Sequence, residues 1–217
     1  MTAEVLPLGG SYADRAYELV RDRLVMLDIR PGEPIDDDSL ATELGFGRTP
    51  VREALKRLER ERLVVAFPRR GTFATPVDMT DLADISEIRK KLEPTAAARA
   101  ARTASGEFRE RLSALAEEIR TFRDDEDPLA LLRRDVRIHR EIYRAAGNPH
   151  LEDILVSLNS HATRIWRLFL DRLPDVSDHV REHVALLKAI VDGDEDEAAR
   201  LALAHIEHFE QAIRSVL

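Results

Sequence analysis

The stretch Gly47–Gly71, GRTPVREALKRLERERLVVAFPRRG, constrains the fold of this 217-residue chain more than any other. Four apolar residues recur on one narrow helical face: Val51, Ala54, Leu55 and Leu58. Pro50, just before them, can occupy the first helical position. A short apolar run over 63–67 follows, then the turn 68–71 and a second short run over 72–75. This order predicts a helix, a strand, a basic hairpin and a second strand, the second half of a winged helix-turn-helix.

Basic side chains gather on the rest of this stretch. Arg48, Arg52 and Lys56 form an i, i+4 row beside the apolar face, and Arg57 and Arg60 widen it. Residues 47–72 hold eight Lys/Arg and three Glu, a net charge of +5, whereas residues 78–217 carry −7 and the whole chain −8. Local positive charge in an acidic chain favours site-selective DNA binding over indiscriminate coating of nucleic acid. The alternative is an ordinary solvated helix face.

The composition excludes several classes of protein. Cysteine is absent, which rules out disulfides, thiolate zinc sites, iron–sulfur clusters and cysteine nucleophiles. No run approaches the roughly 18 apolar residues that a membrane span needs, and the N-terminus has no basic n-region followed by an apolar h-region. We therefore expect a cytoplasmic protein with no membrane partner.

The chain divides into two parts of different character. Before the basic stretch we expect a helix capped by Ser11, a turn over 30–34 and a short helix over 39–44. After it, strand signals vanish and helical patterns alternate with short breakers. The expected fold is mainly α: a winged helix-turn-helix of three helices plus a β-hairpin wing over 1–76, a linker over 77–80, and an antiparallel six-helix bundle over 81–217.

Four polar residues of the second part fall on apolar helical faces. Asp135 and His139 lie one turn apart in the buried stripe of the helix 128–146, and His183 and His205 share faces with apolar residues of the last two helices. A buried carboxylate needs a cation or hydrogen-bond donors. One carboxylate and three imidazoles therefore indicate a site for a divalent transition metal, most consistent with Zn, with Ni, Mn or Fe as further candidates.

Two alternatives remain open at this point. Each histidine can instead be a hydrogen-bonded core residue, with Asp135 and His139 a plain hydrogen-bonded pair. His179 lies one turn before His183 on a similar face, so the pattern does not choose between them.

With both parts in view, the chain resembles the GntR family of bacterial transcription regulators, in the FadR-like branch with the helical FCD effector domain. In the first part the resemblance rests on Pro31-Gly32, Leu40-Ala41, Leu44-Gly45, Arg48 to Leu55, Leu58-Glu59 and Arg70-Gly71. In the second it rests on Arg89, Leu92-Glu93, Asp135 with His139, Gly147-Asn148-Pro149, Glu182-His183, Gly193-Asp194 and His205.

The resemblance implies a homodimer that reads a palindromic operator in double-stranded DNA. Arg48, Thr49 and Arg52 match family positions that contact DNA, and Gly71 matches the glycine at the wing tip. The candidate DNA-binding residues also include the basic residues of the helix and wing, Lys56, Arg69 and Arg70. The chain also departs from the family. Gly47 stands where Ser or Thr is usual, Arg62 replaces the usual Gly after the recognition helix, and Asp38 replaces an Arg that contacts DNA in the fatty-acid-responsive member.

The resemblance also implies the ligands of the second part. The family's metal-binding members use an Asp and a His one turn apart and one His on each of two later helices, which matches Asp135, His139, His183 and His205. Arg89 resembles the family's pocket arginine, which implies a small carboxylate effector. The function expected is a ligand-responsive transcription regulator, a repressor, and not an enzyme. The alternatives are a regulator whose helical part only dimerises, and a metal-dependent enzyme, for which no general base or nucleophile motif is present.

Overall fold

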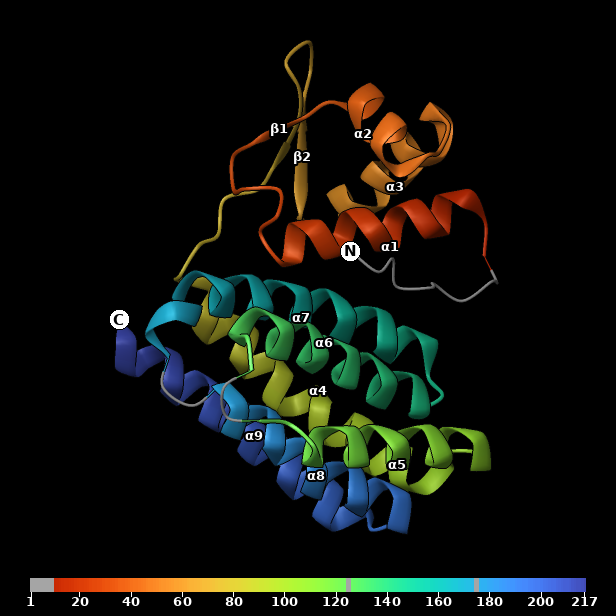
Figure 1. The fold of residues 1–217 in the computed structure, drawn as a ribbon, viewed down its shortest axis with the longest axis vertical. Helices are drawn as coiled ribbons and strands as arrows, with labels where there is room; N and C mark the ends of the chain where they lie inside the picture. The colour runs from red at the N-terminus through yellow and green to blue at the C-terminus, as the bar shows by residue number, and fades with distance from the viewer. Residues whose placement is uncertain (1–9, 124–125, 174–175) are drawn as a thin grey trace. The chain divides into compact units, whose positions relative to one another are not determined.

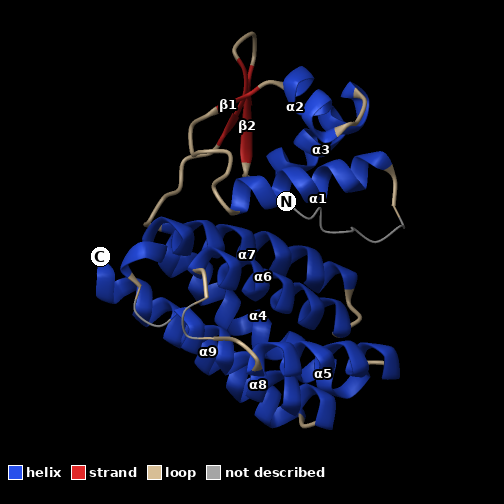
Figure 2. Ribbon diagram, viewed as in Figure 1, coloured by secondary structure: helices blue, strands red, loops and turns tan. Residues whose placement is uncertain are grey.

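The computed structural model describes residues 10–123, 126–173 and 176–217. Residues 1–9, which open the expected first domain, lie outside the described part. The chain divides into two compact units, the first ending at Val77 and the second beginning at Asp78. Helices dominate both units, and the strands lie in the first (Figure 1, Figure 2). The predicted fold class, a winged helix-turn-helix followed by a helical bundle, is confirmed.

The first unit contains three helices and a three-stranded antiparallel sheet in the order β1-β3-β2. Its elements are α1 (Tyr12–Val25), β1 (Pro34–Ile35), α2 (Asp37–Leu44), α3 (Arg48–Arg60), β2 (Val64–Phe67) and β3 (Gly71–Ala74). The pairing of Phe67 with Gly71 across β2 and β3 closes the expected hairpin. The sequence predicts only a turn over 30–34, whereas Pro34 opens β1 and pairs with Phe73. A proline lacks the ladder N–H, so it is tolerated there because β1 is an edge strand.

The start of α3 also differs from the expectation. The helix begins at Arg48, so Pro50 is its third residue rather than its first. Proline is tolerated there because the first N–H groups of a helix have no intrahelical acceptor. The N-cap is Gly47, which has no side chain to cap the helix.

The end of α3 places an arginine in the left-handed backbone region. The N–H of Leu63 donates to the carbonyl of Leu58 and that of Arg62 to the carbonyl of Glu59, each at 3.0 Å. These two bonds define a Schellman motif. Its left-handed residue, usually glycine, is Arg62, with φ of 59°. The chain thereby turns sharply from α3 into β2.

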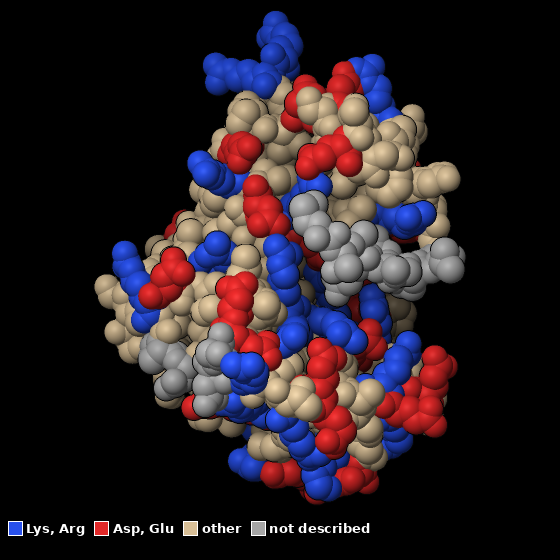
Figure 3. All heavy atoms as spheres, viewed as in Figure 1, with Lys and Arg blue, Asp and Glu red and all other residues tan. Residues whose placement is uncertain are grey.

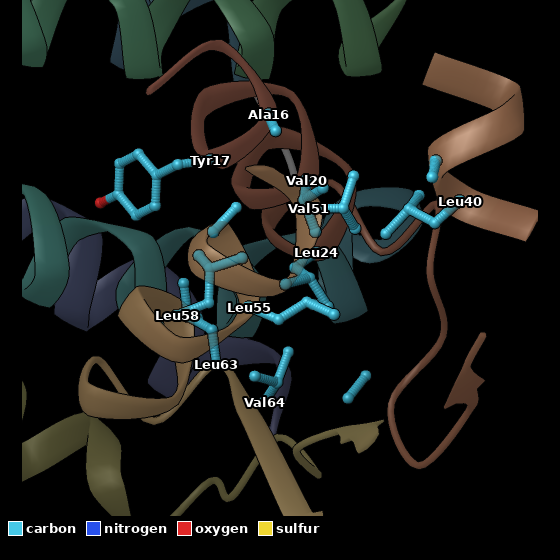
Figure 4. Close-up of a cluster of buried hydrophobic side chains, with 13 residues drawn as sticks. Ala16, Tyr17, Val20, Leu24, Leu40, Val51, Leu55, Leu58, Leu63 and Val64 are labelled. Carbon is cyan, nitrogen blue, oxygen red and sulfur yellow. The ribbon is translucent and has the colours of Figure 1, made fainter. Parts of the chain in front are cut away.

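One hydrophobic cluster fixes α3 against α1 (Figure 4). Val20 and Leu24 of α1 and Val51 and Leu58 of α3 are fully buried in it. Burial of such side chains stabilises a fold by about 1.5–3 kcal/mol each. The apolar face of α3 thus packs inward, and Arg48, Arg52 and Lys56 lie exposed on the rest of the helix.

The second unit is a helical bundle around α4. Its elements are α4 (Asp81–Thr103), α5 (Gly106–Arg120), α6 (Pro128–Ala145), α7 (Pro149–Phe169), a 3-10 turn (Leu170–Arg172), α8 (Val176–Asp192) and α9 (Glu195–Val216). α4 packs mainly along α9 and also contacts α6, α7 and α8. Thr80 is the N-cap residue of α4, but its hydroxyl donates to Asp78 and makes no capping bond. Over the described residues, no helix is long and apolar enough to pass through a bilayer.

Candidate metal centre and nucleic-acid interface

Three buried histidines from three helices converge on one point in the second unit. His139 on α6 lies centrally: its Nε2 is 3.3 Å from Nε2 of His183 on α8 and 3.3 Å from Nε2 of His205 on α9. All three side chains are at most 4% exposed. The structure thus brings together three of the four metal ligands expected from the sequence.

The opposite ring nitrogen of each histidine faces a hydrogen-bond acceptor. Nδ1 of His183 donates to the carbonyl of Val180 at 3.1 Å, and Nδ1 of His205 donates to Oε2 of Glu182 at 2.9 Å. Nδ1 of His139 lies 3.4 Å from Oε2 of Glu93. The acceptors beside His183 and His205 place the proton of each neutral ring on Nδ1 and leave Nε2 as an acceptor, whereas Nδ1 of His139 also lies 3.2 Å from the hydroxyl of Tyr143. Burial lowers the pKa of His183 and His205, which favours the neutral form.

Asp135 completes the cluster from one turn before His139 on α6. Its Oδ2 lies 3.8 Å from Nε2 of His139, and its Oδ1 lies 3.8 Å from Nδ1 of His183. Oδ1 is buried without a hydrogen-bond partner in the described residues. Burial raises the pKa of the Asp135 carboxyl. Ligand atoms of Asp135, His139, His183 and His205 all lie within 4.8 Å of one another.

His179, which the sequence pattern could not separate from His183, occupies a different place. Its ring stacks on that of His205 at 4.1 Å, and its Nδ1 is 3.8 Å from Oε2 of Glu182. Glu182 also accepts from His208, at 2.7 Å. His179 therefore flanks the cluster beside Glu182, and His183 lies within it.

A small cavity adjoins the histidines, and Arg89, the residue expected to bind an effector, is one of the residues that line it. Arg89 is 3% exposed, donates from Nε to Oε1 of Glu93 at 2.5 Å, and lies 5.4 Å over the ring of Phe209. Burial acts to raise the pKa of Glu93, but Arg89 and His139 outweigh it and hold that pKa far below its usual range. The cavity thus contains a paired guanidinium close to the histidine cluster.

Sequence reasoning missed the α7 wall of this cavity. Asn159, Thr163 and Trp166 line it from successive turns of α7. The indole Nε1–H of Trp166 is buried and, among the described residues, has no hydrogen-bond partner. The signal was present in the sequence, since polar residues at 159 and 163 share a face with 166 within an apolar helix.

The candidate DNA-binding residues of the first unit all lie at its surface. Arg48, Thr49, Arg52 and Lys56 are exposed on α3, and Arg69, Arg70 and Gly71 are exposed at the β2–β3 turn. Basic side chains project from the end of the unit that carries this turn (Figure 3). Arg57, however, does not widen the basic face, because it pairs with Asp14 at 2.7 Å and lies 4.0 Å over the ring of Tyr17.

Carboxylates on α2 engage the two arginines expected to read bases. Asp38 pairs with Arg48, and Asp37 pairs with Arg52. All four residues belong to the exposed or half-buried surface. The sequence singled out Asp38 as a departure, but the spacing of 10 and 15 residues gives no periodic signal for either pair.

The chain combines a winged helix module with a helical unit whose cavity is lined by Arg89 and by histidines of the cluster. This is the arrangement of a two-part DNA-binding regulator. Residues 12–74 match the model for bacterial regulatory proteins of the gntR family, and residues 84–208 match the FCD domain. The chain belongs to the GntR family of bacterial regulatory proteins and carries an FCD domain.

Relatives of known name agree with this assignment. The chain is 29% identical over 197 residues to the Nta operon transcriptional regulator of Aminobacter aminovorans, covering 88% of this chain and 90% of that protein. It is 24% identical over 202 residues to the HTH-type transcriptional repressor RspR of Escherichia coli, covering 92% and 88%. The structure of E. coli McbR/YncC shares the fold with a TM-score of 0.81 at 20% identity, covering 95% of this chain and 99% of that one. The chain is therefore a transcription regulator of the helix-turn-helix type, a DNA-binding class, and its relatives are named regulators rather than enzymes.

Proposed function

We propose that this regulator is a ligand-responsive repressor whose helical domain binds a divalent metal and a small organic acid. The DNA-binding domain spans 1–76, the linker 77–80 and the effector-binding and dimerisation domain 81–217. It acts in the cytoplasm as a homodimer on a palindromic operator. The named function of RspR as a repressor supports the sign of regulation.

The observation that carries the metal proposal is the convergence of three Nε2 nitrogens. Nε2 of His183 and Nε2 of His205 each lie 3.3 Å from Nε2 of His139, and one N–H on His139 could donate to only one of them, so a cation among the three nitrogens would satisfy all of them. The unpartnered Oδ1 of Asp135 offers a fourth donor of negative charge. His139, His183, His205 and Asp135 would hold the ion, and a set of three imidazoles and one carboxylate suits Zn, with Ni, Mn or Fe as alternatives.

The outer contacts of these ligands support the same assignment. Metal-binding histidines usually donate their second ring N–H to a carboxylate or a backbone carbonyl, which fixes the ring orientation. Glu182 and the carbonyl of Val180 provide these acceptors for His205 and His183. When bound, the metal would supply a fixed positive charge beside the cavity, which attracts an anionic ligand.

The cavity beside this cluster suits a small acid. Glu93 engages Arg89 through Nε, and the guanidinium would present its Nη groups to a carboxylate in the cavity. The indole N–H of Trp166 is a further donor without a described protein partner. Asn159 and Thr163 add polar groups on α7, and Phe209 supplies an apolar wall.

The first unit would bind DNA through α3 and the wing. Arg48 and Arg52 would contact base edges in the major groove, where each bidentate contact provides about 1–3 kcal/mol of discrimination. Thr49, Lys56, Arg69 and Arg70 would contact phosphates, and Gly71 would let the wing backbone approach the duplex closely.

Selection from a random duplex library tests the DNA half of the proposal. The wild-type protein is expected to enrich a palindromic sequence, and Arg52→Ala is expected to weaken binding to that sequence more than to a scrambled duplex. Arg60→Ala, an exposed arginine at the far end of α3, is the matched control. Equal losses for Arg52→Ala on both duplexes would contradict specific readout by Arg52.

A gel-shift titration on the enriched duplex tests the effector half. Small mono-, di- and tricarboxylates are added to metal-loaded protein, and at least one is expected to release the DNA. Arg89→Gln should abolish that response while DNA binding without acid persists. Binding of an acid in the helical unit with no change in DNA affinity would contradict allosteric coupling, which requires different acid affinities in the two states.

A further inference from the structure

The two α2 carboxylates engage a specific edge of each recognition arginine. Asp38 contacts Nε of Arg48 through Oδ1 and Nη2 through Oδ2, a side-on, bidentate pair. Asp37 contacts Arg52 at Nε. Neither carboxylate occupies the end-on edge that Nη1 and Nη2 form together. That end-on edge can therefore meet the O6 and N7 acceptors of guanine while the carboxylate remains in place.

The carboxylates of α2 and its N-cap also lower the net charge of the segment that carries α2, α3 and the wing. Residues 36–72 hold eight Lys/Arg and seven Asp/Glu, a net charge of +1, because Asp36, which caps α2, and three residues within α2, Asp37, Asp38 and Glu43, add to the three glutamates of 47–72. Attraction to phosphate supplies essentially all non-specific DNA affinity. A segment so nearly neutral gains little binding free energy from the DNA phosphates alone, so its affinity depends on contacts to the bases.

Exposure indicates that both pairs face solvent where DNA would lie. The side chains of Arg48 and Arg52 are 60% and 59% exposed, and that of Asp38 is 45% exposed. Exposed ion pairs contribute about 0–1 kcal/mol to stability, so these pairs are weak reasons for the fold itself. Asp37 and Asp38 also occupy the first turn of α2, where negative charge favours the helix dipole. If Asp37 and Asp38 had only a structural role, these small contributions to stability would be their only effect.

We propose that Asp37 and Asp38 are specificity-determining residues of the DNA interface. They hold the guanidinium groups of Arg52 and Arg48 with their end-on edges outward, and their negative charges repel the phosphates that these arginines would otherwise contact. Overall affinity falls and discrimination between sequences rises. The inference rests on the proposed base readout by Arg48 and Arg52. It adds two residues of α2 that contact these arginines and not the bases.

Isosteric amides remove the charges and keep the shape. The test compares wild-type protein with Asp37→Asn, Asp38→Asn and the double variant. Glu43→Gln is the matched control, because it removes one charge from the same helix at a residue that pairs with Arg23, at 2.8 Å, and not with a recognition arginine. Thermal melting of each variant sets the temperature for the binding assays, which are run where every variant is folded.

Fluorescence anisotropy on a scrambled duplex and on the duplex enriched by the wild type gives the two affinities over a range of salt. We expect the double variant to bind the scrambled duplex about tenfold more tightly, with a salt slope steeper by about 0.9 for each added phosphate contact. The ratio of specific to non-specific affinity should fall about tenfold, since misoriented arginines lose part of their base discrimination. Glu43→Gln should leave that ratio within about twofold, because its charge touches no recognition arginine.

The possible failures are distinguishable. Asparagine variants that keep the wild-type ratio and salt slope, or that change them no more than Glu43→Gln does, overturn the inference and leave the proposed function intact. Wild-type protein that enriches no sequence overturns the proposed base readout itself. Tighter non-specific binding with a lower ratio in the folded variants supports the inference.

Discussion

Arg62→Gly should stabilise the first unit. Arg62 follows α3 with φ of 59°, in the left-handed region, and its N–H and that of Leu63 complete the Schellman motif. This region costs an L-residue about 1–2 kcal/mol and costs glycine almost nothing. The greater freedom of glycine in the unfolded chain opposes the change by about 0.4–1 kcal/mol. The midpoints of these ranges give a net gain of about 0.8 kcal/mol.

Hydrogen exchange of backbone amides in α1 and α3 is the assay, because it reports the opening of the first unit within the full chain. A gain of this size should slow globally exchanging amides about two- to fivefold. Arg60→Gly is the matched control, since it removes the same charge from the last residue of α3, where the backbone is helical and glycine should not stabilise the unit. Exchange in Arg62→Gly that is unchanged or faster would refute the assignment of strain to this position.

Three further outcomes follow from particular contacts. Leu58→Ala, at a fully buried position, should destabilise the first unit by about 2–5 kcal/mol in the same exchange assay, and a loss below 1 kcal/mol would contradict the described core. Glu182→Gln weakens the acceptor for Nδ1 of His205 and should lower Zn affinity about 10- to 100-fold in a competition titration, whereas Glu197→Gln, in the first turn of α9 and paired with Arg200, should not. In metal-stripped protein, the lowered pKa values of His183 and His205 mean that the unfolded chain takes up protons below pH 6.5 before the folded one does. Stability of the second unit should therefore be complete above pH 6.5 and fall on acidification by up to about 1.4 kcal/mol per pH unit for each histidine, and a melting temperature constant between pH 7 and 5 would contradict this.

The helical architecture was predictable because its signal is local. Apolar periodicity and polar breakers located every helix of the second unit, and capping residues such as Asn148 and Asp194 lie where helices begin. β1 escaped prediction because two residues opening with Pro34 have no periodicity. Its existence depends on pairing with β3, a contact nearly forty residues away in the chain.

The candidate site was predictable in its residues and not in its geometry. Periodicity placed Asp135, His139, His183 and His205 on inward faces, but it could not choose between His183 and His179, which lies one turn earlier on a similar face of the same helix. Only the packing of α6, α8 and α9 determines that three Nε2 atoms meet while His179 lies beside Glu182. The α2 carboxylates were likewise beyond sequence reasoning, because side-chain pairing across a turn has no fixed spacing.

Metal content tests the central proposal most directly. The full-length protein is purified without chelator and without a metal-affinity resin, and its divalent metals are measured by mass spectrometry beside His183→Ala. We expect about one divalent ion per wild-type chain, most of it lost in the variant, and a higher melting temperature on adding Zn to stripped wild-type protein. A wild-type protein without bound metal, whose melting is unchanged by Zn or Ni, would contradict the metal-centred sensor and favour a helical domain that only dimerises.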